Sequence, residues 1–210
     1  MKTIVVANQK GGAGKTTFAA NLSVTAENGG HGPIALIDTD PQHSLADWWD
    51  GRESPTPAFV RATVDTLGEK LRALESAGYG LVIIDTPPQA TATIQAVISH
   101  ADLVLIPTRP SPLDLRAVGA TVALVEAEGK RMVFVVNGAA NRARITADAA
   151  ISLSQHGTVS PVTIFQRTLF AEAMIDGRVP MEIEPDSKAG EEMRQLWTYI
   201  KAQLRKEPRK

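Results

Sequence analysis

Apolar residues along the chain form short unbroken runs, separated by segments in which apolar positions recur every three or four residues. Unbroken runs of this length are typical of strands buried on both faces of a parallel sheet. We expect strands at residues 2–8, 33–38, 58–62, 81–85, 103–107, 132–137 and 162–165. We expect helices at 15–26, 65–77, 91–100 and 147–156, and three more whose caps are Ser44, Asp114 and Ser187.

The alternation of these strands and helices predicts an α/β fold with a mostly parallel twisted sheet and helices on both faces. No repeat and no linker of domain-separating length divides the chain, so we expect one domain over residues 1–210. The last helix has one apolar stripe, which we expect to dock on the core rather than to seek a membrane. The stripe consists of Met193, Leu196, Trp197, Ile200 and Leu204.

The amino-acid composition is that of a globular protein, and it excludes several kinds of site. With 43% hydrophobic and 21% charged residues and a net charge of −1, the 210-residue chain is typical of a globular protein, and its global charge does not demand nucleic acid. The absence of cysteine excludes disulfides, thiolate metal sites and Fe–S clusters. The chain starts directly with a strand and has no apolar run near 18 residues, so we expect a cytoplasmic protein without stable membrane association.

The first expected strand leads into the segment KGGAGKTT at residues 10–17, which opens a helix. A strand, a glycine-rich loop and a helix start are the context of a phosphate-binding P-loop, the Walker A motif. Lys15 is expected to reach the β- and γ-phosphates, and the Thr16 hydroxyl to bind Mg²⁺. The residues expected around the nucleotide phosphates are Gly11, Gly12, Ala13, Gly14, Lys15, Thr16 and Thr17.

Carboxylates follow two further strands. Asp38-Thr39-Asp40-Pro41-Gln42 ends one strand, and Asp85 ends the apolar run LVII. Because ligands of open α/β sheets gather beyond the carboxyl ends of the strands, these carboxylates should face the phosphates. Asp85 occupies the Walker B position, from which it would hold Mg²⁺ through a water. An Asp-Pro turn with a capping carboxylate is the structural alternative for residues 38–42.

Lys10 is unusual for a P-loop because it stands five positions ahead of Lys15, where the chain enters from the opposite side. Its position alone leaves two alternatives, a solvated surface lysine and a functional one. The motif KGGxGKTT resembles the deviant Walker A of the ParA/MinD class of P-loop ATPases, and the segments after two later strands resemble those of the small ParF-like partition proteins. This resemblance extends over essentially the whole chain and implies that Lys10 crosses a dimer interface to the partner's nucleotide.

The resemblance also assigns roles to other positions. It implies that Asp40 orients or activates the attacking water and that Asp38 lies nearer Mg²⁺, so Lys10, Lys15 and Asp40 would be catalytic and Thr16, Asp38 and Asp85 would serve the metal. A proline-rich segment after the fifth strand is similar to one that contacts nucleotide and contributes to the dimer, through Pro107 and Pro110. Asn137 stands where the family reads the adenine amino group, and residues 166–170 and 174–177 resemble the segment after the last strand in ParF-like proteins.

The function implied by the resemblance is that of an ATP- and Mg²⁺-dependent homodimeric ATPase that partitions or positions DNA or another cargo. It would bind nonspecific DNA on the nucleoid, and a ParB-like or other small activator would stimulate hydrolysis. The candidate DNA contacts are Arg167, Arg178, Lys201, Arg205 and Lys206. The basic stretch at 201–210 equally fits a solvated helix end. A MinD-like membrane-cycling regulator and a metabolic ligase or synthetase are the alternative functions.

Overall fold

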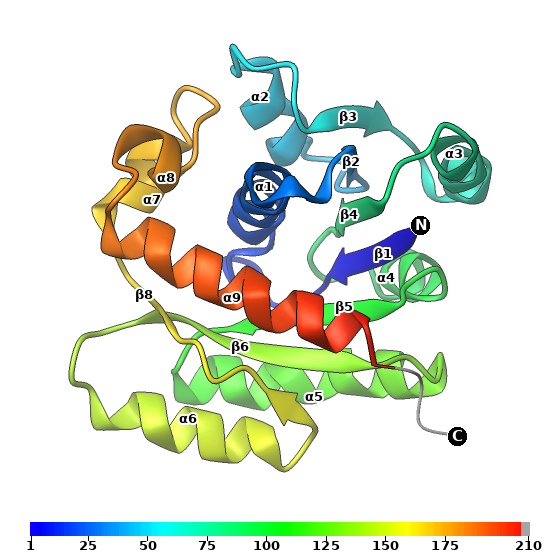
Figure 1. Ribbon diagram of the computed structural model, residues 1–210. Helices are drawn as coiled ribbons and strands as arrows, with labels where there is room; N and C mark the ends of the chain where they lie inside the picture. Colours follow the sequence, from blue (N-terminus) through cyan, green and yellow to red (C-terminus); the bar gives the residue numbers. More distant parts are fainter. Residues whose placement is uncertain (207–210) are drawn as a thin grey trace.

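A computed structural model describes residues 1–206, and a parallel sheet organises this part of the chain (Figure 1). Its strands are β1 (Lys2–Val6), β2 (Ile34–Asp38), β3 (Ala58–Arg61), β4 (Leu81–Asp85), β5 (Leu103–Thr108), β6 (Met132–Ala139), β7 (Thr158–Val159) and β8 (Ile164–Phe165). The strand order is β3-β2-β4-β1-β5-β6-β7, and β8 pairs with the end of β6. Every pair of neighbouring strands is parallel, which confirms the predicted α/β fold.

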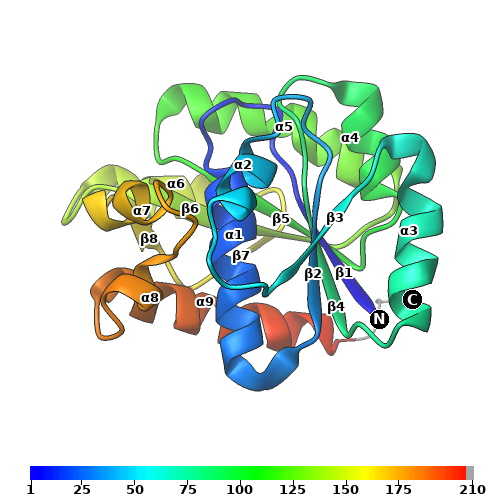
Figure 2. The ribbon, with the colours of Figure 1, turned by 90° about the horizontal axis from the view of Figure 1, so that it is seen from above.

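Helices cover both faces of the sheet (Figure 2). They are α1 (Lys15–Ala26), α2 (Ser44–Asp50), α3 (Val64–Ser76), α4 (Thr91–Ile98), α5 (Pro112–Ala127), α6 (Arg144–Ser154), α7 (Thr168–Ala173), α8 (Pro180–Ile183) and α9 (Lys188–Leu204), with a π-helical turn η1 (Glu27–His31) after α1. Side chains of α1, α2 and α9 form one buried cluster with Ile4 and Val6 of β1. Those of α3, α4, α5 and α6 form another with Val5 and Ala7, because successive strand residues point to opposite faces.

The apolar stripe of α9 lies on the core, as expected. Met193, Leu196, Trp197 and Ile200 are each at most 6% exposed, and Leu204 packs against the same cluster as a partly buried residue. The Ser187 hydroxyl accepts a hydrogen bond from the Gly190 backbone N–H at 3.2 Å, which confirms the predicted cap. No described helix has both the length and the apolar character required to cross a bilayer.

Two predicted helix caps are wrong. The N-cap of α2 is His43 in the left-handed conformation, with φ of 55°, and Ser44 is already the first helical residue. The N-cap of α5 is Ser111, whose hydroxyl accepts from the Asp114 backbone N–H, so Asp114 lies inside the first turn. In α2 the backbone N–H groups of Leu45 and Ala46 donate to the Asp38 carboxylate, so Ser44 is not needed as a cap. In α5 the Ser111 hydroxyl takes the capping place three residues before Asp114.

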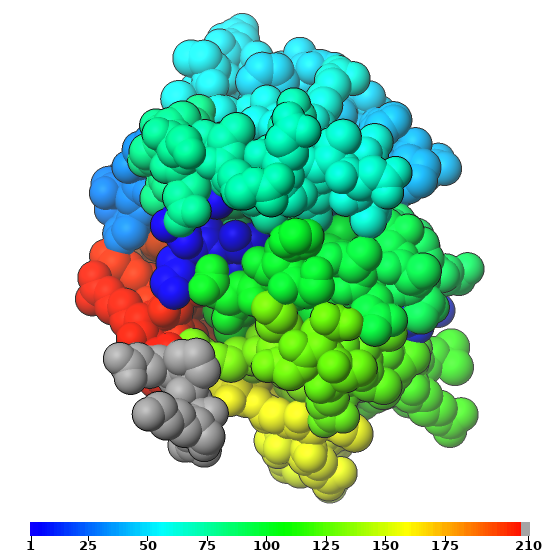
Figure 3. All heavy atoms as spheres, turned by 90° about the vertical axis from the view of Figure 1, so that its right-hand side faces the viewer, coloured from blue at the N-terminus to red at the C-terminus, as the bar shows by residue number. Residues whose placement is uncertain are grey.

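The two ends of the described chain lie on one face of the molecule, where the blue start of β1 is close to the red end of α9 (Figure 3). Lys2 opens β1, and the P-loop follows the other end of the same strand. The helix α9 runs from the P-loop end of the sheet, where Met193 lines a pocket with Gly14, to the face that carries Lys2. These two ends of the sheet carry different groups of the predicted functional residues.

Candidate functional site

The P-loop links β1 to α1 in a conformation that depends on glycine. Gly12 and Gly14 have φ angles of 73° and 94°, a region that side chains with a Cβ rarely adopt. Asn8 fixes the start of the loop, because its side-chain oxygen accepts from the Lys10 backbone N–H and its amide donates to the Pro107 carbonyl, both at 2.8 Å. Gly14 precedes α1, so the first N–H groups of that helix point at the loop's concave side.

Asn137 holds the P-loop from β6. Its side-chain amide donates to the Ala13 carbonyl at 2.7 Å, and a Cβ on Gly14 would lie 2.5 Å from the same amide nitrogen. A side chain at position 14 is therefore excluded by both backbone conformation and space. The sequence did not indicate this contact. The hydrogen bond to Ala13 uses the amide nitrogen of Asn137, and its side-chain oxygen is left to accept from an adenine amino group. The role of Asn137 in reading adenine stays a prediction.

Thr16, Lys15 and Asp85 form the polar centre beside the P-loop. The Thr16 hydroxyl donates to Asp85 Oδ2 at 2.6 Å. Burial raises the pKa of Asp85 to about 7, although the Thr16 hydrogen bond and the Lys15 charge oppose this shift. Burial also lowers the pKa of Lys15, against the attraction of Asp85 and Asp40. A buried carboxyl group and a buried ammonium therefore lie near enough to influence each other's pKa, where a phosphate and a cation would complete their charge balance.

Asp38 and Asp40 occupy the turn after β2. Asp38 lies opposite Asp85 in the register of β2 and β4. Its Oδ1 accepts from the Asp40 backbone N–H at 2.9 Å, and its Oδ2 accepts from the first backbone N–H groups of α2, those of Leu45 and Ala46. Burial raises the pKa of Asp38, and these hydrogen bonds oppose the shift. Asp38 therefore anchors α2 in addition to its predicted role beside the metal.

The donors at this end of the sheet fit Mg²⁺ as a P-loop protein binds it. Mg²⁺ takes one or two carboxylates together with waters and substrate phosphate oxygens, rather than a cage made of protein alone. The Thr16 hydroxyl and the buried Asp85 carboxylate supply hard oxygen ligands next to the phosphate loop, with Asp38 across the register. Residues 1–206 contain no cluster of three acidic, histidine or cysteine side chains that could hold a metal alone.

A pocket next to the P-loop has the lining expected of a base-binding site. Gly14, Thr17 and Phe18 form one side, and Asn137 and Arg109 lie at its edge. The outer wall comes from β8 and α7, through Ile164, Phe165, Gln166, Arg167, Phe170, Ala171 and Met174. Aromatic and apolar side chains with a few polar groups are typical of such pockets. The resemblance of residues 166–170 and 174–177 assigned them no part in a pocket, and nothing in the sequence singled out Arg109, Phe165 or Phe170 individually.

The two predicted prolines lie on either side of that arginine. Pro107 is a buried residue of β5, and Pro110 is partly buried just before α5. Their predicted contact with nucleotide stays a prediction. Arg109, between them, is exposed and reaches the pocket edge beside Gly138.

The predicted DNA contacts fall into two groups at opposite ends of α9. Near the pocket, Arg167 forms an ion pair with Glu192, and Arg178 pairs with Asp176 at 2.6 Å. At the far end, Lys201, Arg205 and Lys206 line a second pocket with Lys2. On α9, Glu192, the partner of Arg167, precedes Lys201 by nine residues, which corresponds to about 14 Å along the helix. Arg209 and Lys210, from the predicted basic stretch, lie outside the described residues.

Lys10 lies on the outer rim of the P-loop. It is exposed, unlike Lys15, which is 7% exposed. Within residues 1–206, no acidic group forms an ion pair with the Lys10 ammonium. The backbone N–H of Lys10 donates to Asn8 Oδ1, which fixes the backbone from which this exposed side chain extends.

Comparison of the sequence with known proteins identifies a family and several relatives. Residues 4–181 match the model described as the CobQ/CobB/MinD/ParA nucleotide binding domain. The chain is 29% identical to the maintenance of carboxysome distribution protein A of Halothiobacillus neapolitanus over 184 residues, which are 83% of this chain and 84% of that protein. It is 35% identical to protein ParA of Rhizobium radiobacter over 130 residues, which are 61% of this chain and 58% of that protein.

Solved structures of low sequence identity share the fold. The MinC:MinD cell division protein complex of Aquifex aeolicus contains a chain that matches with a TM-score of 0.80 at 17% identity, covering 100% of this chain and 99% of that one. The apo McdA structure from Cyanthece matches with a TM-score of 0.78 at 18% identity, covering 95% and 99%. This chain therefore shares the overall fold of these proteins.

Proposed function

The chain belongs to the CobQ/CobB/MinD/ParA nucleotide-binding family and is a P-loop ATPase of its ParA/MinD branch, and we propose that it partitions or positions a cellular cargo as an ATP-dependent homodimer. Lys15, Thr16 and Asp85 would bind Mg-ATP, with the base in the pocket beside Asn137. Asp40 would orient the attacking water. When bound, Mg²⁺ neutralises charge on the phosphates, and the protein contributes position and electrostatics.

The position of Lys10 is the main observation that supports the proposal of a dimer. A P-loop already has its phosphate-binding ammonium in Lys15, which faces Asp85 and Asp40. A second, exposed ammonium on the outer rim has no phosphate of its own chain to bind. In a dimer that brings two P-loops face to face, this ammonium would reach the nucleotide of the partner. There it would stabilise the negative charge that develops on the phosphates in the transition state of hydrolysis.

The named functions of the relatives suggest the kind of cargo. One relative is named for the maintenance of carboxysome distribution, and another is the chromosome-partitioning ATPase Soj of Thermus thermophilus, 30% identical over 155 residues. We propose the same class of task for this chain, with plasmid, chromosome or protein assemblies as candidate cargo. A ParB-like or other small activator protein would stimulate hydrolysis and so time the release.

We propose that nonspecific DNA is bound by the C-terminal basic cluster, defined as Lys201, Arg205 and Lys206. These side chains line one pocket together with Lys2, at the start of β1. Arg167 and Arg178 are weaker candidates because Glu192 and Asp176 already neutralise them. If dimerisation raises the number of phosphate contacts from about three to about six, the slope of log affinity against log salt concentration should steepen from roughly −2.7 to roughly −5.4, so binding should depend on ATP.

A paired experiment tests the DNA proposal. DNA retardation and sedimentation with anionic liposomes are each measured with and without a nonhydrolysable ATP analogue, at two salt concentrations. We expect ATP-dependent, salt-sensitive binding to DNA and none to liposomes. Changing the three residues of the C-terminal basic cluster to alanine should abolish the ATP-dependent binding to DNA. A control variant with the same change in charge should keep this binding; it replaces Arg72, Arg116 and Arg142 with alanine. ATP-dependent liposome binding without DNA binding would refute the DNA proposal and favour a membrane-cycling regulator.

A further inference from the structure

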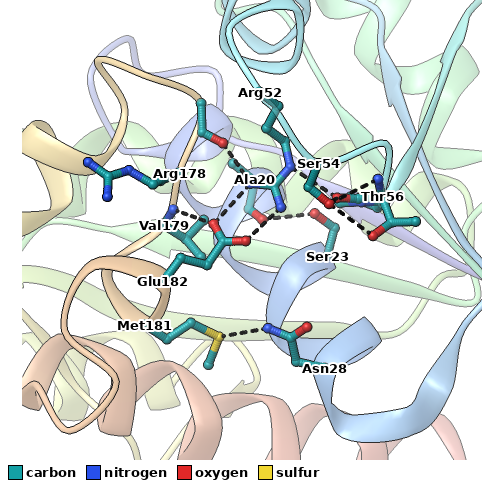
Figure 4. Close-up of polar contacts among 12 residues, drawn as sticks. Ala20, Ser23, Asn28, Arg52, Ser54, Thr56, Arg178, Val179, Met181 and Glu182 are labelled. Carbon is teal, nitrogen blue, oxygen red and sulfur yellow. Dashed lines mark hydrogen bonds and ion pairs between the residues drawn. The ribbon is translucent and has the colours of Figure 1, made fainter.

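Arg52 is a buried arginine outside every motif of the nucleotide site, and its side chain is 3% exposed. Its guanidinium donates to both carboxylate oxygens of Glu182, at 2.9 and 2.7 Å, and to the Gly177 carbonyl at 2.6 Å. Its Nε donates to the Thr56 carbonyl at 3.0 Å, and its charge lies 5.1 Å from the centre of the Trp48 ring. Figure 4 shows Arg52 enclosed between Thr56 on one side and Glu182 on the other.

One side of this cluster is fixed to the phosphate end of the site. Asp38 accepts hydrogen bonds from the first turn of α2, at Leu45 and Ala46. The same short helix carries Trp48, whose indole N–H donates to the Arg178 carbonyl at 3.0 Å, and Arg52 follows two residues after the helix ends. Seven helical residues span only about 10 Å, so α2 is a short rigid link between Asp38 and residues 177–182.

The other side reaches the base pocket. The Arg178 backbone N–H donates to the Ala173 carbonyl, which closes the turn that follows α7. Phe170 and Met174, from α7 and this turn, line the pocket beside Gly14. The turn is packed directly on the backbone of Arg52, since a Cβ on Gly177 would lie 2.5 Å from the Arg52 nitrogen. The position of this pocket wall is thus set by contacts with Arg52 and Trp48.

We propose that Arg52 is a positioning residue for nucleotide binding: with Glu182 it holds residues 174–182 so that α7 stands at the correct distance from the P-loop to enclose the base. This inference rests on the proposed assignment of that pocket to the base. A guanidinium suits the position because its planar fork serves a bidentate carboxylate and backbone carbonyls at once, which the single ammonium of lysine cannot do. If the ion pair of Arg52 and Glu182 only stabilised the fold, its loss would weaken the binding of ATP and the binding of a phosphate ligand without a base to the same extent.

Two conservative variants separate these possibilities. Arg52→Lys keeps the charge but loses the fork, and Glu182→Gln keeps the size but loses the charge. We measure kcat and KM for ATP, and the inhibition constant of Mg-tripolyphosphate, which offers phosphates without a base. We expect KM for ATP to rise about tenfold in both variants, with kcat changed by less than about twofold and the inhibition constant of tripolyphosphate unchanged.

Two controls make the result specific. Arg61→Ala removes a neighbouring ion pair with Asp50 whose side chains are 74% and 54% exposed, and it should leave KM unchanged. Leu153→Ala creates a cavity in α6, away from the pocket wall, and should lower the melting temperature without changing KM. An unchanged KM for ATP in both test variants, or equal losses for ATP and tripolyphosphate, would overturn the proposal. A wild-type protein that binds tripolyphosphate and ATP equally would instead refute the base pocket itself.

Discussion

Replacing Lys15 with methionine should weaken ATP binding and stabilise the empty protein. Lys15 is 7% exposed, and burial lowers its pKa because the charged ammonium loses hydration. Asp85 and Asp40 attract the charge, but their effect is the smaller one. The unfolded chain therefore binds the lysine proton more tightly than the folded chain, and at neutral pH this difference reduces stability. Methionine has a similar length and no charge to bury.

The loss of ATP affinity follows from the contact removed. A hydrogen bond to a charged group contributes about 1.5–3 kcal/mol, which corresponds to an affinity loss of about ten- to a hundredfold. With ATP at about 100 times the wild-type Kd, ligand binding stabilises the wild type by about 2.7 kcal/mol. A variant that binds a hundredfold more weakly would gain only about 0.4 kcal/mol under the same conditions.

Titration calorimetry with Mg-ATP and thermal unfolding with and without ATP measure both effects. We expect the Lys15→Met variant to melt at or above the wild-type temperature without ligand, and to lose most of its ATP-induced shift. The wild-type protein with Mg-ADP serves as the reference for a nucleotide that lacks the γ-phosphate. Wild-type affinity for Mg-ATP in the variant would refute the assignment of Lys15 to the phosphates. A clear drop in the ligand-free melting temperature would refute the argument from burial.

Three further substitutions test the site. Asp40→Ala should preserve ATP binding while abolishing turnover, so that the ATP-held dimer accumulates in light scattering; unchanged steady-state hydrolysis would remove Asp40 from catalysis. Gly14→Ala should lose nucleotide binding, because the new Cβ would require a φ of 94° and would collide with Asn137; a normal ATP titration would contradict this. Asn137→Leu removes the hydrogen bond to Ala13 and should weaken ATP binding about fivefold, which a competition titration would detect.

The parts of the fold that were predictable depend on local pattern. The buried strands β1, β2, β4 and β5 appear as unbroken apolar runs, and the stripe of α9 appears as helical spacing. The two-residue strand β7 and the short helices α7 and α8 were not predicted, because segments of two to six residues carry too little periodicity. Packing against neighbouring elements determines their structure.

In the candidate site, too, the features encoded by local sequence pattern were predictable and those set by tertiary packing were not. The P-loop and Asp85 are local motifs at strand ends, so their meeting in the hydrogen bond between Thr16 and Asp85 could be anticipated. The contact of Asn137 with Ala13 joins residues 124 positions apart, and that of Arg52 with Glu182 joins residues 130 positions apart. No local pattern encodes such pairs, because the tertiary arrangement alone brings them together.

Activity of a mixture of two inactive variants tests most directly whether Lys10 acts across a dimer. Lys10→Ala and Asp40→Ala are each expected to lose hydrolysis. If Lys10 serves the partner's nucleotide, a mixed dimer has one complete site, made of Asp40 from one protomer and Lys10 from the other. The two variants are mixed before ATP is added, so that they pair at random and the Asp40→Ala protein is not already held in its own dimers. An equal mixture should then recover about a quarter of the wild-type activity, since half of the dimers are mixed and each has one working site. If the mixture stays as inactive as either variant alone, Lys10 does not act in trans, and the proposed ATP-bridged dimer is wrong.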